Sequence, residues 1–361
     1  MTGLVVIGGP SASGKSALAL RLAEAIGGVI VNADSMQLYR ELPLLTARPT
    51  PADEARAPHR LYGILDAADP ASVGRWLELA GRAIEDSLAA GRVPIVVGGT
   101  GLYIKALLHG LAPVPDVPAA VRRAVVERLA QVGAPGLHAE LARQDPAMAA
   151  RLGPNDRQRL LRAVEVLAAT GRSLGAWQAE PALRVRLPEP VRGVALLPPR
   201  PELHRRIERR LQAMIDAGAL AELAALRAAR PDPGLPLLKA VAVPELLAHL
   251  DGRLELAHAL ARALARTRQY AKRQMTWLRH QLPELQPLHG FGDELDARPG
   301  GGPPPPPWLT DAAMQHSFRA TPQQGPRPAD QGAGQARRTA AEASIEEPNH
   351  AGRPVRDRDR P

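Results

Sequence analysis

The sequence predicts an α/β protein: a parallel sheet flanked by helices, with an all-helical segment inserted between the two parts of the sheet domain. Short β-branched runs alternate with amphipathic helical segments through the first 110 residues. No convincing strand follows until about residue 190, where another β-branched run occurs. Because consecutive strands separated by helices pair in parallel, these runs are expected to share one sheet.

Residues 1–110 are expected to form the first part of this core. β-branched runs predict strands at 4–7, 29–31 and 95–97, and apolar residues at helical spacing predict helices at 16–26 and 76–88. Residues 111–188 carry helical patterns at 121–131, 136–143 and 156–170. This stretch is interpreted as a helical insertion.

Residues 189–296 are expected to form the second part of the core. They begin with a predicted strand at 191–197, and predicted helices follow at 201–217, 220–229, 244–250 and 254–282. After residue 296 the composition changes to Pro, Gly, Gln, Arg and Ala. Such a segment cannot bury enough apolar surface to offset its ordering entropy, so residues 297–361 are predicted to be a disordered tail.

The composition excludes several classes of protein. The 361 residues include no cysteine, which excludes disulfides, thiolate zinc sites and a cysteine nucleophile and agrees with a reducing cytoplasm. The apolar run at 4–7 is too short for a signal peptide or a membrane span, so we expect a soluble cytoplasmic protein. A net charge of +9 favours a polyanionic partner, although coding bias toward arginine explains the charge equally well.

The strongest chemical signal lies between the first predicted strand and the first predicted helix. There the chain reads Gly9-Pro10-Ser11-Ala12-Ser13-Gly14-Lys15-Ser16. In a P-loop of this form the glycines let backbone N–H groups curl around phosphate oxygens, the lysine neutralises charge, and the final hydroxyl can ligate Mg²⁺. A chance glycine-rich turn is disfavoured because strand, loop and helix stand in register. We therefore predict a P-loop NTPase-like core, with Ser16 as the metal ligand.

The partners of a nucleotide hydrolase or kinase are not evident. The predicted strand at 95–97 ends in Gly98-Gly99-Thr100-Gly101, without the acid of a Walker-B strand. Asp34 instead follows the strand at 29–31, at the edge of the sheet where the P-loop lies, and becomes the candidate base. On spacing alone, an acid that only caps the following turn is equally consistent with this position.

Several further blocks follow in a defined order. They are Ala33-Asp34-Ser35-Met36-Gln37-Leu38-Tyr39-Arg40, Thr46-Ala47-Arg48-Pro49, Pro58-His59-Arg60, Gly98-Gly99-Thr100-Gly101-Leu102-Tyr103, Asn155-Asp156-Arg157-Gln158-Arg159-Leu160-Leu161-Arg162-Ala163 and Arg268-Gln269-Tyr270-Ala271-Lys272-Arg273-Gln274-Met275-Thr276-Trp277. In this order, and together with the P-loop, the blocks resemble the tRNA dimethylallyltransferases, also called tRNA isopentenyltransferases, over residues 3–290.

The resemblance implies transfer of a dimethylallyl group from dimethylallyl diphosphate to N6 of adenosine 37, in tRNAs that read codons beginning with U. Asp34 then matches the base that takes the proton of the exocyclic amine. Ser11 matches a loop hydroxyl close to the donor's bridging oxygen. The leaving diphosphate would be stabilised by the P-loop, by Mg²⁺, and by Arg206 and Arg200. The segment 205–210 is equally consistent with a solvated helix face, and only alignment selects one of its four arginines.

The resemblance also implies contacts with the tRNA anticodon stem-loop. The residues concerned are Asp34, Ser35, Met36, Gln37, Thr100, Arg122, Arg123, Gln158, Arg159, Leu160, Leu161 and Arg162. Tight helix-on-sheet packing explains the glycines around Thr100 as well, and a solvated helix explains Arg122 and Arg123 as well. Tyr270 and Trp277, seven residues apart on a basic helix, are more typical of core packing than of base stacking.

The chain departs from the family's pattern at a few positions. Ala242 stands where the family usually has glycine, and both P-loop hydroxyls are serine instead of the commoner threonine. Arg48 replaces a lysine, and 42–45 replaces an Asp-Ile-Gly segment. A P-loop kinase of a small metabolite and a noncatalytic RNA-binding protein remain the alternative hypotheses. We expect a monomer.

Overall fold

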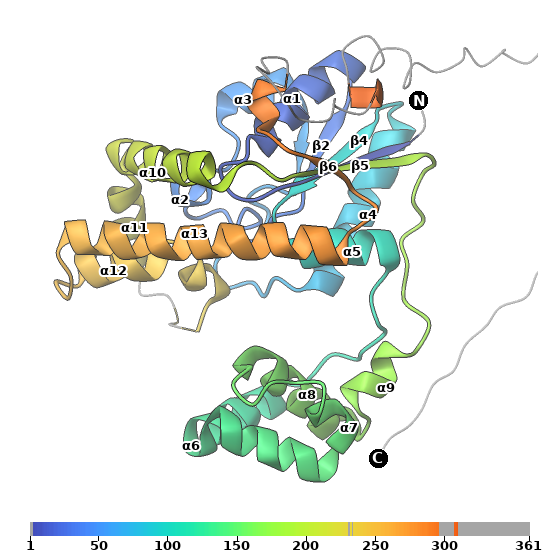
Figure 1. Cartoon of the computed structure of the whole chain (residues 1–361), viewed down its shortest axis with the longest axis vertical. Coiled ribbons are helices and arrows are strands. Elements are labelled where there is room, and N and C mark those ends of the chain that lie inside the picture. Colours follow the sequence, from blue (N-terminus) through green and yellow to red (C-terminus); the bar gives the residue numbers. More distant parts are fainter. Residues whose placement is uncertain (1–2, 230–231, 233, 296–306, 310–361) are drawn as a thin grey trace, which may run out of the picture. The chain divides into compact units, whose positions relative to one another are not determined.

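The computed structural model describes residues 3–229, 232, 234–295 and 307–309 (Figure 1). Its sheet has six strands in the order β3-β2-β4-β1-β5-β6. The strands are β1 (Leu4–Gly8), β2 (Val29–Asn32), β3 (His59–Arg60), β4 (Pro94–Gly98), β5 (Val191–Leu196) and β6 (Gln286–Leu288). Every pairing among them is parallel. The predicted fold class is therefore confirmed.

Strand β1 lies at the centre of the sheet, where Val6 pairs with Val96 on β4 and with Gly193 on β5. Its alternate side chains enter different hydrophobic clusters: Val5 and Ile7 lie in one and Leu4 and Val6 in the other. Because successive strand residues point to opposite faces, both faces of the sheet are covered. All five residues of β1 are buried.

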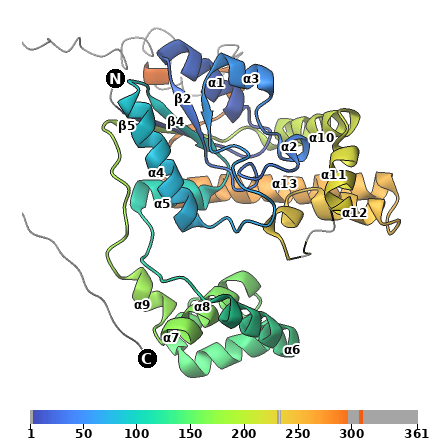
Figure 2. The ribbon, with the colours of Figure 1, turned by 180° about the vertical axis from the view of Figure 1, so that it is seen from behind.

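Helices cover the two faces unequally. The helix α1 (Lys15–Ile26) packs on the face of Val5, together with the short helix α3 (Pro51–Arg56). The opposite face carries α4 (Val73–Ala89), α5 (Gly101–His109), α10 (Arg200–Asp216) and α13 (Leu256–Gln281). Around them lie α2 (Pro43–Thr46), α11 (Ala219–Ala228), η1 (Pro236–Lys239), α12 (Val243–Leu250) and η2 (Gly292–Glu294). Figure 2 shows α4 and α5 beside each other on one side of the strands.

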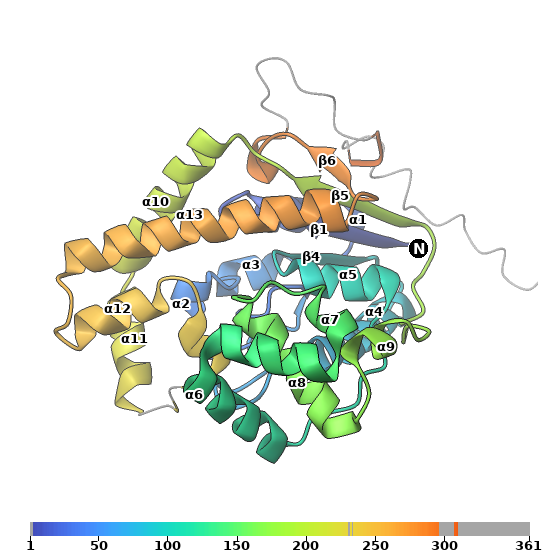
Figure 3. The same ribbon diagram turned by 60° about the horizontal axis from the view of Figure 1, so that its bottom comes forward.

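The insertion contains α6 (Ala119–Gln144), α7 (Pro146–Ala149), α8 (Arg157–Thr170) and α9 (Leu174–Gln178). These helices surround a hydrophobic cluster of their own, which includes Leu129, Leu137, Leu160 and Val166. Figure 3 shows the four helices packed together. The two helices predicted at 121–131 and 136–143 both lie within α6, which is interrupted between them by the non-helical backbone of Gly133, at φ 69° and ψ 174°.

Of the predicted tail, the structure describes only η3 (Pro307–Leu309), whose Leu309 is buried in the cluster on the α1 face. The rest of 297–361 lies outside the described residues. Within the described part of the chain, no helix has both the length and the apolar character needed to cross a membrane.

Candidate active site

The P-loop follows β1 and leads directly into α1. Gly14, the N-cap of α1, has a φ of 79°, and Ala12 also has a positive φ of 64°. The Ser13 N–H donates to the carbonyl oxygen of Pro10 at 3.2 Å, and the Lys15 ammonium donates to the same oxygen at 3.3 Å. The loop therefore curls back on itself at the positive end of the helix dipole.

A cavity of about 430 Å³ opens at this loop, and we call it the P-loop cavity. It is lined by residues 12–16 and by the basic side chains of Arg21, Arg48, Arg56 and Arg210. The Ser13 hydroxyl, which is buried at this cavity, has no hydrogen-bond partner among the described residues. A phosphate oxygen would satisfy that hydroxyl and neutralise the lining cations.

The electrostatics of the P-loop cavity also favour an anion. Burial lowers the pKa of Lys15 to about 8, while the Asp34 carboxylate opposes this shift and the Arg210 guanidinium adds to it. Burial likewise lowers the pKa of Arg210, again opposed by Asp34. Two cations are thus held close together and out of water, so a bound anion would stabilise both.

Asp34 lies just beyond β2, in a turn built around Asn32. The Asp34 N–H donates to Asn32 Oδ1 at 2.8 Å, and the Met36 N–H donates to Asp34 Oδ1 at 3.0 Å. Asp34 therefore does cap its turn, as the alternative interpretation proposed, but with one carboxylate oxygen. Its charge also acts on Lys15 and Arg210, which line the P-loop cavity, while Asp34 itself is outside the lining of that cavity.

Three tyrosines lie within electrostatic range of the same carboxylate. Burial raises the pKa values of Tyr62, Tyr103 and Tyr270, and the Asp34 charge raises each of them further. All three hydroxyls consequently stay protonated near neutral pH and can act as hydrogen-bond donors. Tyr103 is also part of the core, because its ring stacks on Trp76 with centroids 4.5 Å apart.

The loop after Asp34 is braced by Thr100 from the neighbouring strand end. The Ser35 N–H donates to Thr100 Oγ1 at 3.0 Å, and the Thr100 N–H donates to the Ala33 carbonyl at 3.2 Å. Gly98 permits this contact, because a Cβ there would lie 2.1 Å from the Ala33 oxygen. The packing interpretation of the glycine-rich turn therefore holds, while Thr100 itself also lines a cavity described below.

The side-chain amide of Gln37 is hydrogen-bonded to the backbone. Its Nε2 donates to the carbonyls of Thr46 and Ala47 at 2.9 Å each. These bonds join the loop of Asp34 to the segment 46–49. Arg48 of that segment lines the P-loop cavity. Gln37 thus connects the two loops, which is a structural role that its sequence position did not reveal.

Gln274 on α13 is a site residue that the sequence reasoning did not single out. It is 5% exposed, accepts the Ser11 N–H at 3.0 Å, and donates to the Gly99 carbonyl at 2.9 Å. One side chain therefore bridges the P-loop and the glycine-rich turn. The available signal was an amide on a helix face that otherwise carries the buried residues Ala271, Met275 and Leu278.

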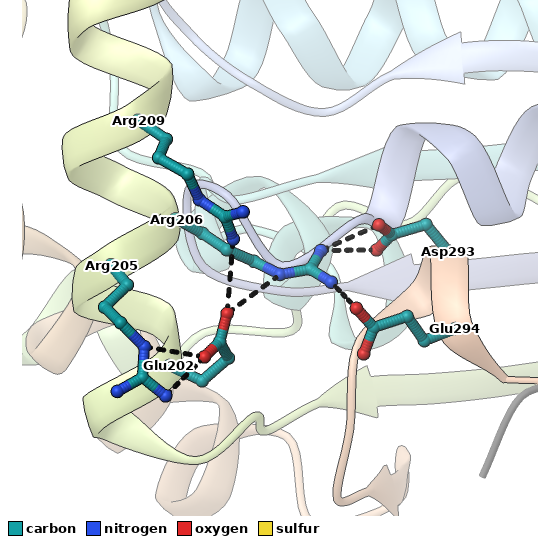
Figure 4. Close-up of polar contacts among 6 residues, drawn as sticks. All are labelled: Glu202, Arg205, Arg206, Arg209, Asp293 and Glu294. Carbon is teal, nitrogen blue, oxygen red and sulfur yellow. Dashed lines mark hydrogen bonds and ion pairs between the residues drawn. The ribbon is translucent and has the colours of Figure 1, made fainter.

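Arg206, predicted to contact the diphosphate, takes part in an ion-pair network instead (Figure 4). Its guanidinium donates to both carboxylate oxygens of Asp293, at 2.8 and 2.7 Å, and to Glu294. It also lies over the ring of Phe291 at 3.8 Å from the centroid. Arg206 does not line the P-loop cavity, whereas Arg210, one helical turn further along α10, does.

The segment that Arg206 holds is packed against the P-loop. The Gly292 N–H donates to the Ser13 carbonyl at 2.9 Å, and Arg21 donates to the Gly292 carbonyl at 2.7 Å. A Cβ on Gly14 would lie within 2.0 Å of an Asp293 oxygen. Arg206 therefore supports the back of the P-loop and has no direct contact with the P-loop cavity.

Arg200, the other predicted diphosphate ligand, is exposed at the start of α10. It lines a separate cavity of about 210 Å³ with His204, Arg268 and Lys272. The structure thus does not bring Arg200 to the P-loop. Its surroundings are basic and suit a phosphate group of a larger ligand.

A larger cavity, of about 710 Å³, contains several residues predicted to contact tRNA; we call it the basic-aromatic cavity. Its lining includes Thr100, Gln158, Arg159, Arg162, Tyr270, Arg273 and Trp277. Tyr270 and Trp277 are half-buried and line this cavity, so core packing does not fully account for them. Trp277 Nε1 has no hydrogen-bond partner among the described residues.

The remaining predicted tRNA contacts lie elsewhere. Leu160 is fully buried in the core of the insertion and Leu161 packs against that core, so neither leucine lines the basic-aromatic cavity. The resemblance had grouped them with their polar neighbours on the same helix. Arg122 and Arg123 are exposed on α6, and Arg122 lies 4.0 Å from Glu165. They too lie outside that cavity.

The residues of the P-loop cavity are compatible with a magnesium ion. Among the described residues no group of three or more His, Asp and Glu side chains could hold a metal by itself. Mg²⁺ commonly needs only one or two protein ligands, because water and substrate phosphates supply the rest. Ser16, a hydroxyl at the phosphate end of the P-loop cavity, fits that pattern.

The chain is similar to proteins of known name. A model of the IPP transferase family matches residues 37–281. A tRNA dimethylallyltransferase of Rhodopseudomonas palustris (strain BisB18) is 56% identical over 282 residues, covering 78% of this chain and 89% of that protein. One of Rhodospirillum rubrum is 55% identical over 279 residues, covering 77% and 86%.

Solved structures agree with these relatives. The crystal structure of the tRNA isopentenylpyrophosphate transferase of Bacillus halodurans has a TM-score of 0.57 at 31% identity, covering 80% of this chain and 89% of that one. A eukaryotic dimethylallyltransferase acting on tRNA has a TM-score of 0.68 at 25% identity, covering 88% and 78%. The P-loop, Asp34 and the parallel sheet thus occur in a chain that belongs to the IPP transferase family.

Proposed function

We propose that this protein transfers a dimethylallyl group from dimethylallyl diphosphate to N6 of adenosine 37 in tRNAs that read codons beginning with U. The observation that carries the proposal is the position of Asp34. Its charge acts on Lys15 and Arg210 of the P-loop cavity, and its loop is braced by Thr100, which lines the basic-aromatic cavity. The names of the relatives agree with this chemistry.

The diphosphate of the donor binds in the P-loop cavity. Lys15 and Arg210 neutralise its charge, and the Ser13 hydroxyl donates to one of its oxygens. Mg²⁺, when bound at Ser16, would supply further charge neutralisation to the leaving diphosphate. Because negative charge on the diphosphate grows as it leaves, these groups stabilise the transition state more than the ground state.

In the transfer step the N6 nitrogen forms a bond to C1 of the dimethylallyl group as the C1–oxygen bond breaks. The bonding electrons leave with the diphosphate, and one N6 proton passes to Asp34. An exocyclic adenine amine is a weak nucleophile, so a positioned base contributes about 10²- to 10⁴-fold to the rate. The Ser11 hydroxyl, which the resemblance sets close to the donor's bridging oxygen, would donate a hydrogen bond to the leaving group.

The RNA binds across the basic-aromatic cavity. Arg159, Arg162 and Arg273 suit the phosphate backbone, while Tyr270 and Trp277 offer ring faces for unstacked bases. An adenosine in an anticodon loop must leave its stack before its N6 can reach Asp34. Since one chain builds both cavities, we propose that a monomer acts on tRNA in the cytoplasm.

The function is tested by incubating tRNA with the protein, Mg²⁺ and dimethylallyl diphosphate, and measuring modified nucleosides by mass spectrometry. We expect N6-isopentenyladenosine from the wild type. Asp34→Asn is expected to lose at least 10²-fold in single-turnover rate with donor affinity little changed. ATP-dependent phosphate transfer without tRNA, and no isopentenyladenosine, would refute the proposal.

A further inference from the structure

The helix α13 contacts both the basic-aromatic cavity and the P-loop. Tyr270, Arg273 and Trp277 of this helix line the basic-aromatic cavity, and Gln274 lines it as well. Because residues three and four apart on a helix are neighbours, Tyr270 and Trp277 flank Gln274 on the helix surface. An RNA that rests on these two rings therefore contacts α13 at the level of Gln274.

The amide of Gln274 is hydrogen-bonded to two loops of the active site. Its Oε1 accepts the Ser11 N–H at 3.0 Å, and its Nε2 donates to the Gly99 carbonyl at 2.9 Å. The side chain is 5% exposed, so water competes little for either bond. A Cβ on Gly99 would collide with Nε2, so this close contact requires glycine. We call the two bonds together the Gln274 bridge.

The glycine-rich turn at one end of the Gln274 bridge also supports the loop of the candidate base. Gly101 packs against the ring of Trp277, since a Cβ on Gly101 would collide with Cδ1 of that ring. Thr100, the preceding residue, accepts the Ser35 N–H in the loop of Asp34 at 3.0 Å. The position of α13 therefore affects the loop of the base as well as the P-loop.

The P-loop needs support from outside because part of its backbone is strained. Ala12, next to Ser11, has a φ of 64°, a region that is unfavourable for an L-residue. Such a conformation persists only where the surrounding structure holds it. The bond from the Ser11 N–H to Gln274 is one of the contacts that do so. Docking of α13 therefore favours the P-loop conformation that surrounds the P-loop cavity.

We propose that Gln274 is a positioning residue that couples RNA binding to donor binding. RNA on Tyr270 and Trp277 holds α13 against the two loops, and the Gln274 bridge then holds the P-loop in the conformation that binds a diphosphate. Coupling between two sites is reciprocal, so bound donor strengthens RNA binding by the same factor. The proposal rests on the proposed function, because tRNA and dimethylallyl diphosphate are its two ligands.

The test measures the Kd of dimethylallyl diphosphate by titration calorimetry in the presence of Mg²⁺, with and without a saturating anticodon stem-loop RNA. Purine riboside replaces adenosine 37 in this RNA, so the reacting amine is absent and no transfer occurs. In the wild type we expect the RNA to lower the donor Kd by at least about 5-fold. The donor should lower the RNA Kd by the same factor.

Two substitutions break the Gln274 bridge. Gln274→Met keeps most of the side-chain volume without an amide, and Gln274→Asn keeps an amide that is one methylene too short to reach both loops. In each variant the RNA should change the donor Kd by less than about 2-fold, while the RNA Kd without donor stays within about 3-fold of wild type. Gln274→Asn keeps the test valid if Gln274→Met does not fold.

Leu278→Met is the matched control. Leu278 is a buried residue of α13 that packs over Gly8, just before the P-loop, and a swap of similar volume leaves the Gln274 bridge intact. Its coupling should equal that of the wild type. A wild type without coupling overturns the proposal, as does coupling that survives in both Gln274 variants or is also lost in Leu278→Met. Loss of RNA binding itself in the Gln274 variants would likewise overturn it. A wild type that binds neither ligand would overturn the proposed function.

Discussion

At the scale of single residues, the site depends on which arginine of α10 reaches the P-loop. The sequence 205–210 offers four arginines within two turns, and spacing alone does not select among them. In the structure Arg206 pairs with Asp293 and Glu294 (Figure 4). Arg210, in contrast, lines the P-loop cavity. The helical phase of α10 relative to the sheet decides between them, and that phase depends on tertiary packing.

Arg210→Ala is therefore expected to lower kcat by about 10²- to 10³-fold, because it removes a cation that stabilises the leaving diphosphate. Arg206→Ala should act mainly on the support of the P-loop, raising KM for the donor with a smaller loss in kcat. Steady-state kinetics of both variants with saturating tRNA separates these effects. Arg209→Ala, which removes an exposed arginine of the same helix paired with Glu202, is the control. A larger kcat loss in Arg206→Ala than in Arg210→Ala would reverse the two roles.

The lowered pKa of Lys15 has a consequence for the pH dependence of donor binding. In the unliganded protein Lys15 loses its proton as the pH rises through about 8, so the donor then meets a neutral amine. We expect the donor Kd to increase above pH 8, by up to about 10-fold per pH unit while the bound form stays protonated. Equilibrium binding of dimethylallyl diphosphate from pH 6.5 to 9.5 measures this.

Lys15→Arg serves as the control for that measurement, because the guanidinium stays charged over the whole range. Its profile should be flat, even if its affinity is lower. A Kd that rises identically in the wild type and in Lys15→Arg would assign the titration to another group.

At the scale of elements, the four β-branched runs all became strands, and the long amphipathic patterns became α1, α4, α8, α10 and α13. The sequence did not reveal β3 and β6, which are two and three residues long and contain no β-branched residue. Tertiary pairing with β2 and β5 forms them. Helix α5 was not predicted either. It begins at Gly101, within the glycine-rich turn after β4, and glycine has a low helix propensity.

The backbone of α12 at its N-terminus gives a stability prediction. Ala242→Gly removes an unfavourable left-handed conformation, at φ 72°, but adds freedom to the unfolded chain, so the free energy of unfolding should rise by about 0.5–1 kcal/mol. Urea unfolding of the protein without ligands measures this change. A lower urea midpoint for Ala242→Gly would mean that packing of the Ala242 methyl group stabilises the protein by more than the strained backbone destabilises it.

The contact between α13 and the P-loop can be tested in the same way. Gln274→Ala leaves the Ser11 N–H and the Gly99 carbonyl without their partner, and should cost about 2–3 kcal/mol of stability while raising KM for the donor. Gln281 also lies on α13, and its exposed side chain accepts a hydrogen bond from Lys105 of α5. Gln281→Ala removes that bond and should change stability by less than about 0.5 kcal/mol. Equal changes in stability and in donor KM for the two variants would show that Gln274 does not support the site.

At the scale of the whole molecule, the net charge of +9 does not by itself identify a polyanionic binding partner, because coding bias toward arginine and RNA binding predict the same composition. The structure adds position: Arg159, Arg162 and Arg273 come from helices far apart in sequence and line one cavity with Tyr270 and Trp277. No local sequence pattern could predict that these side chains line one cavity. The helix faces could be predicted, but not the cavity they share.

Binding of tRNA should therefore depend strongly on salt. Arg162→Ala is expected to weaken tRNA binding and to reduce the slope of log K against log salt by about 1, with KM for the donor unchanged. Filter binding from 50 to 300 mM salt measures the slope. Arg143→Ala, an exposed arginine on α6 outside the basic-aromatic cavity, should leave the slope as it is. An unchanged slope in Arg162→Ala would place the RNA elsewhere.

The proposed transfer is tested most directly by counting its two products together. Purified protein, Mg²⁺, tRNA and dimethylallyl diphosphate are incubated, and released diphosphate and N6-isopentenyladenosine are quantified in the same sample, for the wild type and for Asp34→Asn. The proposed mechanism predicts one modified adenosine for each diphosphate released, and loss of both products in Asp34→Asn. Release of diphosphate without modified adenosine, or full activity in Asp34→Asn, would contradict it.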